Sequence, residues 1–177
     1  NVQNMVASAL LRSGLAPQRL EIEVTETVLV DELKVASAAL SEIAAKGIGI
    51  ALDDFGTGYS SLGYLHDLPF SKLKIDRTFT ADVTSDPRSL KLMRNIARMS
   101  RDLEMTVTVE GVETEEQLQV IAQLGLIDQV QGYLFGVPVP QNEISSLVYS
   151  LSGRQPPSGV TGKETGPDLV KSGPARA

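Results

Sequence analysis

The segment IGIALDD, residues 48–54, predicts a buried β-strand at 48–52 that is followed by two acidic residues. Side chains alternate between the two faces of a strand, so its branched aliphatic residues share one face. The other face carries Gly49, Ala51 and Asp53. A branched face is suited to packing under helices, whereas the second face would line the lumen of a parallel barrel. The segment therefore predicts a strand of an α/β protein with an acid near the carboxyl end of its inner face.

Four further segments repeat this plan, each with a branched aliphatic face and a polar or charged group near its carboxyl end. They are LEIEV (20–24), LKI (73–75), TVTVE (106–110) and QVQGY (129–133). Helical patterns alternate with them and are expected at 2–13, 31–46, 87–103, 114–124 and 143–151. This alternation predicts a parallel α/β sheet or barrel. In a parallel barrel, catalytic groups collect at the carboxyl ends of the strands.

Polar residues near these carboxyl ends form a candidate site. They are Glu23, Asp53, Asp54, Lys74, Glu110 and Gln131. Any one of them could be a strand-terminal group that reaches solvent, but the shared position on five strands favours a common site. Two carboxylates about 4 Å apart repel by roughly 1 kcal/mol in water and by about 4 kcal/mol at an effective dielectric of about 20. Either some acids are protonated or a cation lies among them, and this set favours Mg²⁺ or Mn²⁺ over a general-acid pair.

The composition excludes several other kinds of site. The 177 residues include no cysteine and one histidine, His66, which excludes disulfides and thiolate metal sites and disfavours a histidine-rich zinc site. The net charge of −6 disfavours binding of a DNA or RNA polymer, which needs a basic surface. A small phosphate ester is still compatible with this charge, because a divalent cation can reverse the local field. No apolar run approaches the roughly 20 residues that span a bilayer.

The character of the sequence changes at Gly153. Residues 153–177 are rich in glycine and proline and lack apolar periodicity, which predicts a disordered tail or linker. Residues 1–152 are expected to form the folded part.

The candidate residues lie in segments that resemble the EAL phosphodiesterase family. In family order these are EVTET (23–27), DDFGTGYSSLGYL (53–65), LKIDRTF (73–79), VEGVET (109–114) and QGYLFGVP (131–138). The pair DDFGTGYSSL and KIDR is the most specific, and the resemblance covers about residues 1–150. It implies a partial TIM-like (β/α)8 barrel. We expect its first strands to be lacking, because the Glu-Ala-Leu motif is absent and a full barrel takes about 250 residues.

The resemblance also implies an activity, the metal-dependent hydrolysis of cyclic di-GMP to the linear dinucleotide pGpG. Two Mg²⁺ or Mn²⁺ ions are implied, with Asp53 between them. By resemblance, the metal ligands are Glu23, Asp53, Asp54 and Glu110. Lys74 and Gln131 resemble the residues that position the attacking water, and they are expected to form the catalytic group together with Glu110 and Glu113.

Three further assignments each have two interpretations. Glu113 resembles the glutamate that holds the loop at residues 55–61 in its working shape, but an acid at a helix N-terminus is nearly as well explained by the helix dipole. Phe135 and Pro138 follow Gln131 closely and could contact guanine. Packing in the core or at the rim is the simpler explanation of both.

The absent opening of the barrel leads to further expectations. It would supply two metal ligands and an arginine for the substrate phosphate. Without it, the strand at 20–24 would be an open edge. We therefore expect the isolated chain either to be poorly stable or to pair its edges with another chain. We also expect it to be inactive, and the parent domain to be the phosphodiesterase.

An alternative function is that of a degenerate EAL domain, which binds cyclic di-GMP as a signalling module without cleaving it. Such members usually lose acids or the DDFGTG loop, and both are kept here. The resemblance is also compatible with a homodimer through the loop after Asp54 and with an upstream sensory or GGDEF domain. We expect a cytoplasmic domain, in a parent protein that could be anchored in a membrane.

Overall fold

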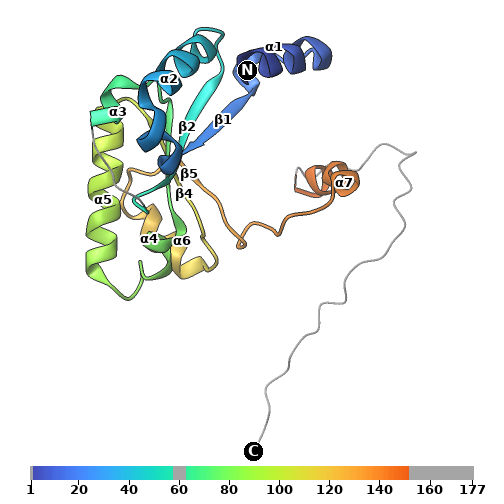
Figure 1. The fold of residues 1–177 in the computed structure, drawn as a ribbon. Coiled ribbons are helices and arrows are strands. Elements are labelled where there is room, and N and C mark those ends of the chain that lie inside the picture. The colour runs from blue at the N-terminus through green and yellow to red at the C-terminus, as the bar shows by residue number, and fades with distance from the viewer. Residues whose placement is uncertain (1, 58–62, 152–177) are drawn as a thin grey trace, which may run out of the picture. The chain divides into compact units, whose positions relative to one another are not determined.

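Five parallel strands form the sheet of the chain (Figure 1). The computed structural model describes residues 2–57 and 63–151. The strands are β1 (Glu21–Thr25), β2 (Gly49–Phe55), β3 (Lys72–Ile75), β4 (Thr106–Val109) and β5 (Gln129–Val130), and they lie side by side in this order. Each neighbouring pair is parallel. The predicted α/β fold is therefore confirmed, and each predicted strand is present with shifted bounds, β5 being shorter than expected.

Four of the helices that alternate with these strands were predicted. They are α1 (Val2–Ser13), α2 (Glu26–Ala44), α5 (Pro87–Asp102) and α6 (Glu115–Ala122). Helix α2 begins at Glu26, before the expected start at residue 31, because β1 passes directly into it. Thr25 stands at the N-cap with extended backbone angles of φ −72 and ψ 148. Three short elements were not predicted, the 3-10 helix η1 (Pro17–Arg19), α3 (Gly63–Asp67) and α4 (Arg77–Ala81).

The core lies between the outer face of the sheet and the helices. The aliphatic residues predicted for that face are fully buried at the centre of the sheet, namely Ile50, Leu52, Leu73, Ile75, Val107 and Val109. Helix α5 contacts β3 and β4 and buries Met93, Ile96 and Ala97 against them. Burying one such aliphatic side chain contributes about 1.5–3 kcal/mol. This packing fixes the inner face, where the polar residues of the strands lie.

The chain divides into two compact units, residues 1–136 and 137–177, and the sheet belongs to the first. The second unit contains α7 (Gln141–Leu151), which agrees with the helix predicted at 143–151. The predicted boundary after residue 152 stays a prediction, because the tail at 153–177 lies outside the described residues. In the described part of the chain, each helix is too short or too polar to cross a bilayer.

Candidate metal centre

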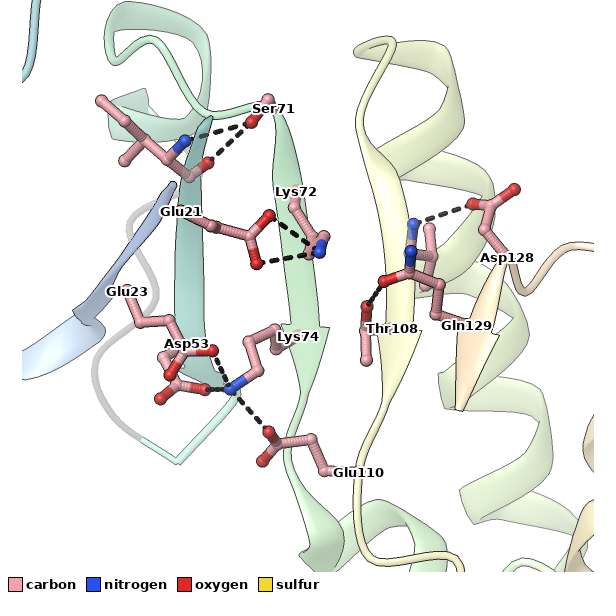
Figure 2. A network of polar contacts seen from close by, with 12 residues as sticks. Glu21, Glu23, Asp53, Ser71, Lys72, Lys74, Thr108, Glu110, Asp128 and Gln129 are labelled. Atoms are coloured by element: carbon pink, nitrogen blue, oxygen red, sulfur yellow. Dashed lines mark hydrogen bonds and ion pairs between the residues drawn. The ribbon is translucent and has the colours of Figure 1, made fainter. Parts of the chain in front are cut away.

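Three acids from different segments meet at one lysine at the carboxyl end of the sheet (Figure 2). Lys74 Nζ lies 2.8 Å from Glu23 Oε1, 2.8 Å from Asp53 Oδ1 and 2.7 Å from Glu110 Oε1. The lysine comes from β3, and the acids come from β1, from β2 and from the residue after β4. The side chain of Lys74 is 6% exposed, whereas that of Glu23 is 48% exposed. The parity of the strands thus predicted which side chains converge.

A β-bulge in β2 brings a second aspartate into the same site. Leu52 pairs with Leu73 and Phe55 pairs with Ile75, so two residues of β2 lie opposite the single residue Lys74. In a regular strand, consecutive side chains would point to opposite faces. The backbone of Asp54 has a positive φ of 54°, a conformation that aspartate tolerates better than most residues. One carboxylate oxygen each from Asp53, Asp54 and Glu110 therefore lie within 4.8 Å of one another.

A second ion pair lies beside this site on the inner face of the sheet. Lys72 Nζ lies 2.8 Å from the Glu21 carboxylate, one step earlier along β1 and β3 (Figure 2). Glu21 is not among the predicted site residues, and the structure shows it in this ion pair. This pair has one positive and one negative charge, whereas Lys74 faces three carboxylates.

The pKa values reflect the excess of negative charge around Lys74. Burial alone would lower the pKa of the Lys74 ammonium, but its contacts with the carboxylates of Asp53, Glu110 and Glu23 raise that pKa well above its ordinary value. Burial also raises the pKa of the Asp54 carboxyl, and the negative charge of Asp53 raises it further. The shifts therefore favour the charged form of Lys74 and the neutral form of Asp54.

The donor set fits a hard divalent cation. Oδ1 of Asp53 is buried and, among the described residues, accepts no hydrogen bond of good geometry, although Lys74 Nζ lies 2.8 Å away. A buried carboxylate oxygen with a free lone pair is costly unless a further cation or donor approaches it. Lys74 neutralises only one of the four negative charges of Glu23, Asp53, Asp54 and Glu110. Oxygen ligands of this kind are those that Mg²⁺ and Mn²⁺ prefer.

Two of the remaining predicted site residues line a neighbouring cavity. Gln131 and Glu113 line a cavity of about 160 Å³ together with Glu110 and Arg77. This cavity adjoins the site through Glu110. Phe135 lies in the same unit and is 48% exposed. Pro138 belongs to the second unit.

Glu26 is a residue that the sequence analysis missed. Its side chain is buried, with 1% exposed, and its Oε2 accepts a hydrogen bond of 3.2 Å from the backbone N–H of Gly56, just after the two aspartates. The spacing of Glu23 and Glu26, at the end of a strand and the start of a helix, is a signal that could have revealed it. The role given to Glu113 stays a prediction, because residues 58–62 of the loop lie outside the described part.

Comparisons with known proteins agree with this arrangement. A family model described as EAL domain matches residues 2–138. The chain is 41% identical over 143 residues to the bifunctional diguanylate cyclase/cyclic di-GMP phosphodiesterase MucR of Pseudomonas aeruginosa, covering 81% of this chain and 21% of that protein. It spans only 18% to 21% of the length of three curated relatives.

Solved structures show the same fold. The structure described as "PaMucR Phosphodiesterase, c-di-GMP complex" superposes with a TM-score of 0.74 at 40% identity, covering 80% of this chain and 57% of that chain. The Klebsiella pneumoniae BlrP1 manganese/cy-diGMP complex superposes with a TM-score of 0.68 at 33% identity, covering 76% and 34%. These likenesses confirm the predicted barrel-type fold.

Proposed function

The chain belongs to the EAL domain family, and from this premise we propose that its parent domain hydrolyses cyclic di-GMP to linear pGpG with bound divalent cations. The name of MucR includes a cyclic di-GMP phosphodiesterase, and the manganese complex of BlrP1 contains the dinucleotide. Because the chain spans about a fifth of its curated relatives, activity is proposed for the parent domain.

The observation that carries the proposal is the cluster of Asp53, Asp54 and Glu110 beside Lys74. Each of these three acids places one carboxylate oxygen within 4.8 Å of the others. The buried Oδ1 of Asp53 lies 2.8 Å from Lys74 Nζ and has no hydrogen bond of good geometry in the described part of the chain. This arrangement suits a cation better than a proton. Asp53, Asp54, Glu110 and Glu23 would hold the ions. Two divalent ions would lower the pKa of a water and offset the charge that develops on the phosphate.

Lys74 has an electrostatic role in this proposal. Its Nζ lies within 2.8 Å of three carboxylate oxygens, which favours the protonated form and makes it a poor proton acceptor. A permanent cation at this position would stabilise a hydroxide that attacks phosphorus. Gln131 lines the cavity next to Glu110 and would help to orient the water.

The reaction adds one water across one phosphodiester bond. The water oxygen forms a bond to phosphorus, the bond from phosphorus to the ribose 3′ oxygen breaks, and that oxygen leaves with a proton. The product is a linear dinucleotide with one phosphate monoester. A cyclic dinucleotide has two such bonds, and a single hydrolysis opens the ring.

Base recognition is assigned to the segment after β5. Phe135 is 48% exposed in the first unit, where an aromatic ring could stack on guanine. Pro138 is proposed as a second contact. A basic surface that could neutralise a nucleic acid polymer is not expected at a net charge of −6.

The proposed partners follow the same relatives. MucR joins a diguanylate cyclase to its phosphodiesterase, which supports a GGDEF or sensory domain upstream of this chain. We propose a homodimer through the loop after Asp54 and a cytoplasmic position for the domain.

The test is hydrolysis of cyclic di-GMP with Mg²⁺ or Mn²⁺, by the chain alone and by the protein that carries it. Turnover by the larger protein, lost in Asp53→Ala, supports the proposal. Binding of the dinucleotide without turnover would support a signalling module that does not cleave it. Turnover that survives Asp53→Ala would remove Asp53 from the metal site.

A further inference from the structure

Glu110 lies just beyond the end of β4, and its backbone is held from two sides. Its N–H donates to the Ile75 carbonyl at 3.0 Å, and its own carbonyl accepts from the Thr80 hydroxyl at 2.6 Å. Its carboxylate Oε1 lies 2.7 Å from Lys74 Nζ. Because the strand ends at Val109, the Thr80 hydroxyl takes the place of a ladder hydrogen bond on the carbonyl side of this ligand.

The Thr80 hydroxyl is used in an unusual way for a helical threonine. A threonine in a helix commonly bonds to a carbonyl three or four residues earlier in the same helix. Thr80 lies in α4 and is fully buried, yet its hydroxyl reaches a carbonyl 30 residues away in sequence. A valine would fill the same space without a hydroxyl. The hydroxyl therefore serves as a specific tie between α4 and the ligand.

The side chain of Gln117 extends this tie to the segment after Glu110. Gln117 Nε2 donates to the Thr80 carbonyl at 3.2 Å. Its Oε1 accepts from the N–H groups of Glu113 at 2.8 Å and Thr114 at 3.1 Å. Gln117 lies in the first turn of α6 and is 9% exposed. One buried amide thus joins α4, the segment from Glu110 to Thr114 and the start of α6.

Two close backbone approaches confine the same segment. Gly111 has a φ of +69°, and a Cβ there would lie 2.4 Å from the Cβ of Arg77. A Cβ on Gly132 would lie 2.1 Å from the Val112 carbonyl oxygen. The segment is therefore packed between the start of α4 and the residues after β5, where a side chain would not fit.

We propose that the Thr80 hydroxyl and the Gln117 carboxamide are positioning groups that set the metal affinity of the site through Glu110. The inference rests on the proposed metal-dependent function. It adds two residues to the site that hydrogen-bond to backbone groups and not to the carboxylates of the proposed metal ligands. Loss of a hydrogen-bonding partner behind a metal ligand typically weakens metal affinity about 10–100-fold. Removing the Thr80 hydroxyl or the Gln117 carboxamide would not remove any of the proposed contacts with the substrate.

The test compares Thr80→Val with Thr80→Ser in the protein that carries this chain. Mn²⁺ binding is followed without substrate, by electron paramagnetic resonance of the free ion. Valine keeps the shape and removes the hydroxyl, so we expect the Mn²⁺ Kd to rise about tenfold. Serine keeps the hydroxyl, so Thr80→Ser should bind Mn²⁺ nearly as the unsubstituted protein does. At saturating Mn²⁺, the KM for cyclic di-GMP should be unchanged in Thr80→Val.

Ser100→Ala is the matched control. Ser100 is also fully buried, and its hydroxyl donates to the Ile96 carbonyl at 2.8 Å within α5, away from Glu110. We expect this variant to lower the thermal midpoint and to leave the Mn²⁺ Kd unchanged. Gln117→Met removes the carboxamide at similar length and should weaken Mn²⁺ binding as Thr80→Val does, which keeps the test decisive if Thr80→Val fails to fold.

Two results would overturn the inference. The first is an unchanged Mn²⁺ Kd in Thr80→Val or in Gln117→Met, and the second is an equal loss of affinity in Ser100→Ala. If the unsubstituted protein binds no Mn²⁺, the proposed metal function fails, and the inference fails with it. If it binds Mn²⁺ and the Thr80 and Gln117 variants bind equally well, only the positioning role fails.

Discussion

Glu26 Oε2 accepts a hydrogen bond of 3.2 Å from the backbone N–H of Gly56, 30 residues farther along the chain. Glu26 is the first residue of α2, and Gly56 follows the strand that carries the two aspartates. The contact therefore ties the helix after β1 to the loop after β2. Its carboxylate is buried, so the position of that loop depends on a group that lies in a different part of the sequence.

Glu26→Ala should release this loop and reduce turnover. We expect the rate of cyclic di-GMP hydrolysis to fall about tenfold, the scale seen when outer partners of a metal site are removed. Glu26→Gln keeps an oxygen acceptor and should lose less. Initial rates at saturating Mn²⁺ measure the effect, with thermal midpoints as a check on folding. Equal rates in Glu26→Ala and the unsubstituted protein would contradict the role.

Substitutions of Asp54 should separate backbone strain from charge. Asn tolerates a positive φ nearly as well as Asp, whereas Ala has a penalty of about 1–2 kcal/mol there. Both changes remove a carboxyl whose pKa is raised by burial and by Asp53. We therefore expect Asp54→Asn to be more stable than Asp54→Ala by about 1 kcal/mol in urea unfolding, with hydrolysis lost in both. Equal stability of the two variants would show that the φ of 54° costs nothing.

Lys74→Met should make stability depend on added cation. The change leaves the carboxylates of Glu23, Asp53 and Glu110 without their ammonium, and we expect the free energy of unfolding to fall on the order of 3 kcal/mol with a chelator present. Mn²⁺ should restore part of this loss, because it binds only the folded state.

Lys72→Met is the control for Lys74→Met. Lys72 pairs only with Glu21, at 2.8 Å, in the described part of the chain, and the two side chains are 17% and 35% exposed. We expect a loss below about 1 kcal/mol that Mn²⁺ does not restore. A similar response to Mn²⁺ in both variants would argue against a metal ion bound by the carboxylates beside Lys74. Urea unfolding at neutral pH, with and without Mn²⁺, measures both.

Asp76 should give the protein an acid-sensitive component of stability. It caps α4, accepting from the Thr78 N–H at 2.9 Å. Burial would raise the pKa of Asp76, but the hydrogen bonds from Thr78 and Arg77 outweigh it and lower that pKa. A lowered folded pKa contributes stability above the unfolded value of about 3.9 that is lost as the pH falls through the folded pKa.

Asp76→Asn keeps a capping oxygen and does not titrate. The difference in unfolding free energy between the unsubstituted protein and the Asp76→Asn variant should be constant above about pH 5 and should shrink below about pH 4. Chemical unfolding of both proteins across this range measures it. A difference that does not change with pH would mean that the Asp76 pKa is the same in the folded and unfolded states.

The sequence was sufficient for the sheet and for most of the site because both depend on a local period. Alternation along IGIALDD predicted which side of β2 packs under helices, and Leu52 is fully buried as expected. The same parity predicted that Glu23, Asp53 and Glu110 would meet, and all three contact Lys74.

The features that the sequence did not predict depend on contacts between distant segments. Glu26 accepts a hydrogen bond from Gly56, 30 residues away, and Glu21 pairs with Lys72, 51 residues away. Helix α4 has five residues, too few to show a helical period, and its first turn is recognisable only from the Asp76 cap. No periodicity within a segment can report these pairings.

The bulge in β2 has a consequence for how such centres are recognised in other proteins. Without the bulge between Leu52 and Phe55 the strand would alternate regularly, and one of two adjacent aspartates would then turn away from Glu110. Two adjacent aspartates after a strand are therefore an insufficient signature. The strand must also contain the extra residue of the bulge, and the second aspartate must adopt a left-handed backbone conformation. The number of residues between the flanking hydrophobic residues is therefore as diagnostic as the presence of the two acids.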